Sequence, residues 1–327
     1  MKNTYLVFII SCIFLLSCKD KHHFDSIKIS GNVFGTTYNI TYLNTNVNYQ
    51  KSIDSLFLLV NKSLSTYIPT SDISKINAGD STIVIDEFFK EVFQKSIRIH
   101  EETNGYFDPT VGNLVNSWGF GPKNEKKNLD SLQVNKMMQL VGLDKVSLVD
   151  GKIKKDAPEI YLDFNSIAKG YGIDVIGRFF ESKNLDNYLI EIGGEIRARG
   201  KNSKNKNWRV AIDNPNTDGT RSFADVVALD NQSMASSGNY RKFRLTENGQ
   251  KYVHTVNPIT GFATESNLLS ATVYAPLDCA DVDAYATAFM AMGLEKTKEF
   301  LEEHTEVKAI LMYVNKNGDL VEYKNSN

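Results

Sequence analysis

The chain has 327 residues, enough for one large domain or two small ones, and its 42% hydrophobic and 23% charged composition is that of an ordinary globular protein. A net charge of −2 with scattered basic residues argues against a nucleic-acid partner. Two of the three cysteines, Cys12 and Cys18, lie in the first 18 residues, which leaves Cys279 alone in the folded part and excludes an internal disulfide.

The N-terminus has the pattern of an export signal. Lys2 precedes an apolar run, residues 5–16, that is shorter than the roughly 20 residues of a membrane-spanning helix. The run ends in Leu-Leu-Ser-Cys18, which resembles a bacterial lipobox with Cys18 as the lipid-carrying residue; the alternative is a plain secretory signal with an incidental cysteine. We expect a lipoprotein signal at 1–18, a tether at 19–26 and one domain at 27–327, exported and lipid-anchored to a bacterial membrane, with the periplasmic face of the inner membrane as the expected location.

The first half of the expected domain contains strands, helices and one long loop. We predict a strand-like run at 27–42, helices at 49–64, 86–103 and 130–142, a hairpin at 145–155 and a strand at 160–164. The loop at 104–127 is rich in Gly, Pro, Asn and aromatic residues and is too long to be a mere connector. Such loops often carry function.

The second half mixes strands with helices. We predict a helix at 165–183, strands at 188–192, 195–200, 208–212, 224–229 and 269–275, a hairpin around Asn248-Gly249, helices through Thr287 and up to His304, and a terminal hairpin at Asn317-Gly318. Helices and strands neither alternate as βαβ units nor separate into blocks. The predicted fold class is therefore α+β, with mixed or antiparallel sheets flanked by helices.

Asp283 and Thr287 are candidate metal ligands. They lie four positions apart, so a helix would point both oxygen ligands the same way. Such a pair is most often a solvated helix face, but this helix is otherwise small and apolar, and a buried carboxylate needs a partner or a metal. Hard oxygen ligands without a thiolate or histidine cluster suit Mg²⁺ or Ca²⁺.

His254 is the candidate general base. It lies among Gly, Pro and Thr turn residues shortly before the candidate metal helix. The other histidines offer less, because His22 and His23 fall in the tether and a surface role is expected for His100 and His304 on amphipathic helices. An imidazole beside an oxygen-ligand cation suggests chemistry on a phosphate.

Four further segments have both a functional and a structural interpretation. The loop at 104–121 could stack on a planar ring or be an Asp-Pro turn pinned by apolar residues, and the strand-to-helix junction at 163–172 could bind an anion or pack a glycine-bearing helix on the sheet. Ile192-Gly-Gly-Glu195 is expected to be a tight turn. Ser236-Ser-Gly-Asn-Tyr240 could cradle a phosphate or be a turn.

Taken together, these segments resemble the ApbE family of FAD:protein FMN transferases. Nine matches follow one another in order: Phe34-Gly-Thr-Thr-Tyr38; Leu64-Ser-Thr-Tyr67 with Ser71-Asp-Ile-Ser74 and Asn77; Gly105-Tyr-Phe-Asp-Pro-Thr110; Trp118-Gly-Phe-Gly121; 163–170; Ile192-Gly-Gly194; Ser237-Gly-Asn-Tyr240; 254–261; and 283–287. The resemblance implies a T-fold-related flavin transferase domain over nearly the whole mature chain.

The resemblance also implies roles for individual residues. The FAD site would be lined by Phe34, Tyr67, Tyr106, Phe107, Asp108, Asp163, Lys169 and Thr255. Mg²⁺ would be held by the Ser166 carbonyl and the side chains of Asp283 and Thr287, and His254 would be the base. The enzyme would move FMN from FAD to a threonine of a client redox protein, for example a subunit of a membrane electron-transfer complex, and release AMP.

Three positions depart from the family pattern. Asn239 and Asn257 stand where the family usually has Asp, and Ser166 stands where it usually has Ala. A main-chain ligand tolerates the serine, whereas the two asparagines remove negative charge near the reacting phosphates. Two other functions remain open: an FAD pyrophosphatase that releases FMN and AMP, and a flavin-binding lipoprotein without turnover.

Overall fold

The computed structural model describes residues 26–122, 129–215, 220, 222–239, 243–245, 251–263 and 266–325. The predicted signal with Cys18, the tether up to residue 25 with His22 and His23, Tyr240, and the turn at Asn248-Gly249 lie outside the described residues. Within the described part of the chain, no helix is both long and apolar enough to cross a membrane.

An eight-stranded sheet, in which every neighbouring pair is antiparallel, is the centre of the fold. In spatial order its strands are β1 (Ser26–Val33), β2 (Thr36–Leu43), β5 (Tyr188–Ile192), β6 (Glu195–Arg199), β9 (Gln232–Gly238), β12 (Leu268–Ala275), β13 (Lys308–Val314) and β14 (Leu320–Lys324). The other described strands pair in hairpins: β3 (Val146–Val149) with β4 (Lys152–Lys155), β7 (Trp208–Asp213) with β8 (Phe223–Leu229), and β10 (Phe243–Leu245) with β11 (Lys251–Val253).

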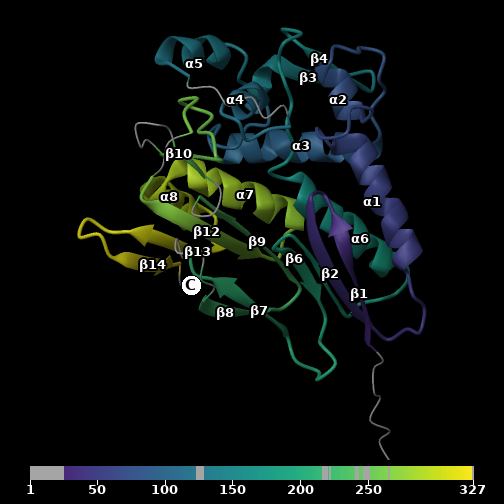
Figure 1. Ribbon diagram of the computed structural model, residues 1–327. Helices are drawn as coiled ribbons and strands as arrows, with labels where there is room; N and C mark the ends of the chain where they lie inside the picture. The colour runs from purple at the N-terminus through teal and green to yellow at the C-terminus, as the bar shows by residue number, and fades with distance from the viewer. Residues whose placement is uncertain are drawn as a thin grey trace, which may run out of the picture.

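Helices cover one face of this sheet (Figure 1). The described helices are α1 (Gln50–Leu64), α2 (Asp72–Asn77), α3 (Glu87–Glu102), α4 (Gly112–Ser117), α5 (Ser131–Met138), α6 (Ala168–Ser182), α7 (Cys279–Met292) and α8 (Leu294–Glu303). α6, α7 and α8 lie directly on the sheet, and α2 to α5 form a further layer above them with the β3–β4 hairpin. The β7–β8 hairpin packs against the opposite face through a separate apolar cluster.

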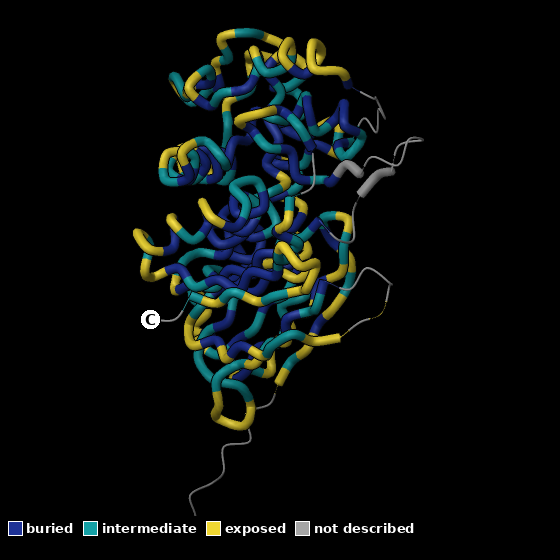
Figure 2. Tube along the Cα trace, turned by 90° about the vertical axis from the view of Figure 1, so that its left-hand side faces the viewer, coloured by how far each residue is buried: buried dark blue, intermediate teal, exposed yellow. Residues whose placement is uncertain are grey.

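α7 is buried on all sides, which its run of small residues permits. Ala280, Ala284 and Ala288 are fully buried, so the helix approaches both the sheet below and α3 above. Figure 2 shows the buried residues concentrated in this middle region of the molecule. A helix that is apolar all round belongs in a core. The carboxylate of Asp283 on this helix is therefore held in the interior.

The first turn of α7 is capped by a carboxylate from α6. Asp174 is fully buried and accepts hydrogen bonds from the amides of Cys279 and Ala280, both at 2.8 Å. Arg197 on β6 donates to the same carboxylate at 2.6 Å. Burial, and then the charge of Asp278, raise the pKa of Asp174 to about 7, while Arg197 and the helix amides oppose the rise. This cap fixes where α7 begins.

Asp174→Ala is expected to lower the free energy of unfolding by about 3 kcal/mol, because two buried amides lose their acceptor. Urea denaturation followed by circular dichroism measures the change. The exposed Asp186→Ala, whose side chain makes a 3.3 Å ion pair with Arg199, is the control and should stay within about 0.5 kcal/mol of the wild type. Equal stability of the two variants would contradict the capping role.

Most predicted elements are confirmed, with shifts of a few residues at their ends. The predicted run at 27–42 is wrong as a single strand, because Phe34 and Gly35 turn it into the β1–β2 hairpin with φ values of 50° and 75°. The predicted loop at 104–127 contains α4, and α2 was not predicted. Residues 236–238 are not a turn but the end of β9.

The predicted strand at 160–164 is also wrong, for a reason visible in its hydrogen bonds. Its apolar residues are buried, but the main chain of Leu162 bonds the side chain of Asn77 in both directions, each at 2.8 Å. The amide side chain supplies the donor and acceptor that a neighbouring strand would supply. The isolated β-bridge that residues 160–164 make within the described part of the chain is between Tyr161 and Val111.

Candidate functional site

The start of α6 meets α7 through one hydrogen bond. The amide of Gly170 donates to Oδ2 of Asp283 at 3.1 Å. In a regular helix this amide would bond the carbonyl four residues earlier, which here belongs to Ser166. Because the carboxylate takes the amide, the Ser166 carbonyl accepts no hydrogen bond from the described residues. The carbonyl and the carboxylate therefore share one end of α6, and both can accept an electropositive partner.

The donor set at this point fits a hard divalent cation. Oδ1 of Asp283 accepts no hydrogen bond from the described residues, and burial raises the pKa of this carboxyl against the opposing effects of Lys169 and the Gly170 amide. Thr287 lies one turn further along α7 and is half-buried. No three His, Cys, Asp or Glu side chains gather as a metal cluster anywhere in the described residues. One carboxylate with neutral oxygens is a donor set that suits Mg²⁺.

Gly170 is required by the close approach of the two helices. A Cβ at this position would lie 2.3 Å from the carbonyl oxygen of Cys279 and 2.7 Å from the amide nitrogen of Ala280. These are main-chain atoms of α7, so the clash can be relieved only if one helix moves away from the other. The glycine thus keeps the Ser166 carbonyl next to Asp283.

Gly170→Ala is expected to cost about 1–3 kcal/mol of stability through this overpacking. Gly172→Ala, also on α6, meets the ring of Phe34 at 2.5 Å; this aromatic side chain at a hairpin tip moves more readily than a main chain, so we expect a smaller loss. Thermal unfolding of the two variants side by side makes the comparison. A larger loss at Gly172 would show that the α6–α7 contact is the more adaptable one.

Lys169, in the first turn of α6, forms an ion pair with Oε1 of Glu195, the first residue of β6. The lysine side chain is 30% exposed and the glutamate side chain only 4%. Burial opposes the lysine charge, but the attraction of Glu195 and Asp283 outweighs it and raises the pKa of Lys169. The expected turn at Gly193 and Gly194 is confirmed, with φ values of 65° and 108°. No role was predicted for that turn, and the burial of Glu195 beside Lys169 was not predicted either.

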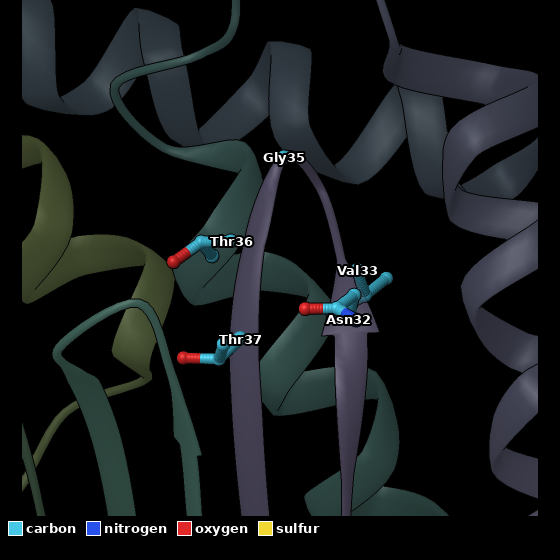
Figure 3. A pocket seen from close by; sticks show the side chains of 5 residues that line it. All are labelled: Asn32, Val33, Gly35, Thr36 and Thr37. Carbon is cyan, nitrogen blue, oxygen red and sulfur yellow. The ribbon is translucent and has the colours of Figure 1, made fainter.

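The β1–β2 hairpin reaches α6 with its tip. The ring of Phe34 packs edge-on against Phe57, with ring centres 5.5 Å apart, and lies over Gly172. Phe34 is a bulky residue at positive φ, a conformation that costs free energy and that often occurs at functional sites. A pocket of about 440 Å³ opens beside the tip (Figure 3). It is lined by Asn32, Val33, Gly35, Thr36 and Thr37.

Tyr67 and Asp163 lie close to each other. Tyr67 follows α1 and is 60% exposed, so its ring is available to stack on a planar ligand. Burial, and then the charge of Asp163, raise the pKa of the Tyr67 hydroxyl. Asp163 is buried and its Oδ1 accepts from the amide of Asn165 at 2.8 Å; burial raises the pKa of Asp163 to about 6 against that hydrogen bond.

The loop after α3 uses its polar groups to hold itself together. Oδ1 of Asp108 accepts from both the amide and the hydroxyl of Thr110, at 2.8 and 2.6 Å, and Oδ2 accepts from the amide of Leu143 at 3.2 Å. Phe107 is buried in the main core. Tyr106 has the ammonium of Lys296 over its ring, 5.5 Å from the centre. The side chains of Phe107 and Asp108 thus shape the loop, which supports the Asp-Pro turn interpretation.

His100, in the last turn of α3, packs against this loop, contrary to the surface role expected from the sequence. Its Nδ1 lies 2.9 Å from the carbonyl oxygen of Phe107 and 3.5 Å from Oδ2 of Asp108. The side chain is only about a quarter exposed. The sequence signal was weak, because the partner carboxylate lies eight residues further along, beyond the end of α3.

His254 lies on the loop that follows β11 and is half-buried. The next residue, Thr255, is buried and donates to Oδ1 of Asn239 at 3.1 Å. Asn257 closes the turn by accepting from the amide of Ile259 at 2.9 Å, and its Nδ2 donates to the carbonyl of Ala291 near the end of α7 at 3.0 Å. An aspartate could not make this last bond. Both asparagines therefore have structural partners here.

The predicted site residues thus fall into several groups. Ser166, Lys169 and Asp283 lie around the start of α6. The ring of Phe34, from the hairpin tip, lies over Gly172 of the same helix, and Thr287 lies one turn beyond Asp283 on α7. Tyr67 and Asp163 form a second group. His254 and Thr255 lie on a loop that Asn257 ties to the far end of α7. Tyr106 contacts Lys296 of α8, and its neighbour Gly105 lies beside Ile259 of the loop that carries His254.

Comparison with known proteins gives a consistent result. A family model described as the ApbE family matches residues 34–311. The FAD:protein FMN transferase of Haemophilus influenzae is 38% identical over 292 residues, which are 85% of this chain and 84% of that protein. The FAD:protein FMN transferase of Vibrio cholerae is 33% identical over 334 residues, covering 100% of this chain and 98% of that protein.

Solved structures are similar as well. The flavin transferase ApbE from Vibrio cholerae superposes with a TM-score of 0.83 at 32% identity, over 93% of this chain and 98% of that one. The apo form of the flavinyl transferase ApbE of Pseudomonas stutzeri gives a TM-score of 0.82 at 25% identity, over 93% and 95%. The α+β fold predicted from the sequence is confirmed by these likenesses.

Proposed function

The chain belongs to the ApbE family, and we propose that it is an FAD:protein FMN transferase, which moves FMN from FAD onto a client protein. FAD is then a substrate, and the second substrate is a protein. The assignment is supported because the match covers nearly the full length of both this chain and its relatives. It therefore includes the sheet and the helices that bear the candidate site.

The acceptor that we propose is a threonine hydroxyl of a client redox protein. Its oxygen forms a bond to the FMN phosphorus, the pyrophosphate P–O bond breaks, and AMP leaves with the electron pair. We assign the proton of the hydroxyl to His254, which lies on a turn that is anchored on both sides by Asn239 and Asn257. Lys169 offers a cation to the substrate phosphates, and the exposed ring of Tyr67 offers a stacking surface.

We propose a Mg²⁺ site formed by the Ser166 carbonyl, Asp283 and Thr287. The observation that carries it is the hydrogen bond from Gly170 to Asp283, which leaves the Ser166 carbonyl and one carboxylate oxygen open at the same end of α6. When bound, the ion would neutralise charge on the FAD pyrophosphate. The raised pKa of Asp283 supports the same assignment, since a buried carboxylate without a cation is unfavourable.

Mass measurement of a client tests the function. The purified protein is incubated with FAD, Mg²⁺ and a candidate client, and the client is expected to gain the mass of FMN while AMP accumulates. FMN and AMP in solution with an unlabelled client would favour the pyrophosphatase. Intact FAD would favour the flavin-binding lipoprotein.

We also propose export and lipid anchoring through Cys18, with the periplasmic face of the inner membrane as the location. The support is the sequence of residues 1–18, with its apolar run and its Leu-Leu-Ser-Cys ending. Cys18→Ser should leave the protein in the soluble fraction after cell breakage. Continued lipid labelling of that variant would contradict the assignment.

A further inference from the structure

Glu195 has a buried carboxylate of which one oxygen is paired and the other has no hydrogen-bond partner among the described residues. The paired oxygen is Oε1, which bonds Lys169, and the other is Oε2. A Cβ on Gly193 would lie 3.4 Å from Oε2 and 2.8 Å from Cγ2 of Thr36, so the oxygen faces the turn beside the hairpin tip. The hydroxyl oxygen of Thr36 would lie 3.2 Å from the same Cβ, but it makes no hydrogen bond to Oε2.

Such a group is unfavourable for stability. A buried carboxylate oxygen without a donor costs free energy, and burial raises the pKa of Glu195 above its ordinary value, although Lys169 opposes the rise. Replacing a buried ion pair by neutral groups is often neutral or stabilising. The ion pair as a whole therefore adds little to stability, and its use has to be sought in what Glu195 does to Lys169.

We propose that Glu195 is a positioning residue for flavin transfer, which holds the ammonium of Lys169 at the start of α6. The inference rests on the proposed function, in which Lys169 meets the substrate phosphates. Three observations carry it: the ion pair itself, the near-complete burial of Glu195, and the partial exposure of Lys169 in the first turn of α6, where Gly170 bonds Asp283. A long lysine side chain has many rotamers, and one fixed anchor removes most of them.

The proposal predicts that a substitution of Glu195 lowers turnover without weakening the binding of FAD. Glu195→Gln keeps an acceptor for the lysine but removes a negative charge close to the phosphates, so FAD should bind as tightly as before or more tightly. The ammonium is held less firmly, and a misplaced group can cost about 10²-fold in rate. We expect kcat for AMP release and FMN transfer to fall by about ten- to a hundredfold, without a rise in KM for FAD.

The experiment compares four proteins with the wild type: Glu195→Gln, Lys169→Gln, the double variant, and Glu191→Gln. Glu191 is the matched control, because it lies on the same hairpin and bonds Asn39 and the amide of Gly194 instead of Lys169. Each protein is measured for kcat, KM and melting temperature. Acetylation of Lys169 by an isotope-labelled reagent, read by peptide mass, reports the lysine environment without any turnover.

The inference is supported if Glu195→Gln lowers kcat at a temperature well below its melting transition and raises the acetylation rate of Lys169 by about tenfold, the change for one pKa unit. In the Lys169→Gln background the glutamate change should then alter kcat by less than about twofold, since both act through one group. It is overturned if Glu195→Gln behaves like Glu191→Gln, or if the two changes are additive. A wild type that binds FAD but releases no AMP would instead overturn the proposed function.

Discussion

Asp283→Asn is expected to abolish Mg²⁺-dependent AMP release and FMN transfer, with a loss of about 10³-fold or more. The asparagine keeps an oxygen that can accept from Gly170, at 3.1 Å in the wild type, so the contact between α6 and α7 is retained. What is lost is the charge of the one carboxylate in the proposed site. The measurement is the initial rate of AMP formation from FAD over a range of Mg²⁺ concentrations.

The stability of the same variant separates a metal ligand from a structural aspartate. Burial raises the pKa of Asp283, so the charged form is unfavourable in the folded protein, and its removal should keep or raise the melting temperature. Thermal unfolding with and without Mg²⁺ should show stabilisation by the ion in the wild type and none in the variant. Wild-type AMP production by Asp283→Asn would refute the metal assignment.

The elements that were predicted correctly are those whose signal is local. α1 and α3 bury residues at helical spacing, and the β3–β4 hairpin turns at Asp150 and Gly151, both at positive φ. The β1–β2 hairpin was missed because its turn places phenylalanine where Asn or Gly is usual. The strand expected at 160–164 fails because a side chain from α2, Asn77, makes the bonds of a neighbouring strand.

In the candidate site, too, the features with a local signal were predicted and those that depend on tertiary contacts were not. Asp283 and Thr287 follow from spacing on one helix, but the approach of Asp283 to the start of α6 depends on the glycine contact between α6 and α7, across more than a hundred residues of sequence. Glu195 could not be found from its Gly-Gly turn, because its importance comes from burial beside Lys169. Tertiary packing brings Asp283, Lys169 and Glu195 together, and these contacts cannot be predicted from a single sequence.

The two asparagines that stand where the family usually has aspartate also have a physical explanation in this chain. Asn257 donates to the carbonyl of Ala291, and Asn239 accepts from Thr255. Both bonds hold the segment that carries His254. Asparagine at these two positions is therefore compatible with a firmly held His254 segment.

His254→Gln is expected to lower FMN transfer by about 10²- to 10⁴-fold, the usual contribution of a general base. FAD binding in the presence of a chelator should be unchanged, because the proposed role concerns the hydroxyl of the client. Melting temperature should also be close to that of the wild type, since the loop is held by Thr255 and Asn257.

A second variant distinguishes a base from a residue that only shapes the loop. His254→Gly leaves space for a small molecule, and added imidazole should restore part of the transfer activity, more strongly at pH values where imidazole is neutral. A residue that acts by packing would not be replaced by a diffusible base. Equal activity of His254→Gly with and without imidazole would show that another group takes up the proton. Unimpaired FMN transfer by His254→Gln would show that the histidine has no part in the mechanism.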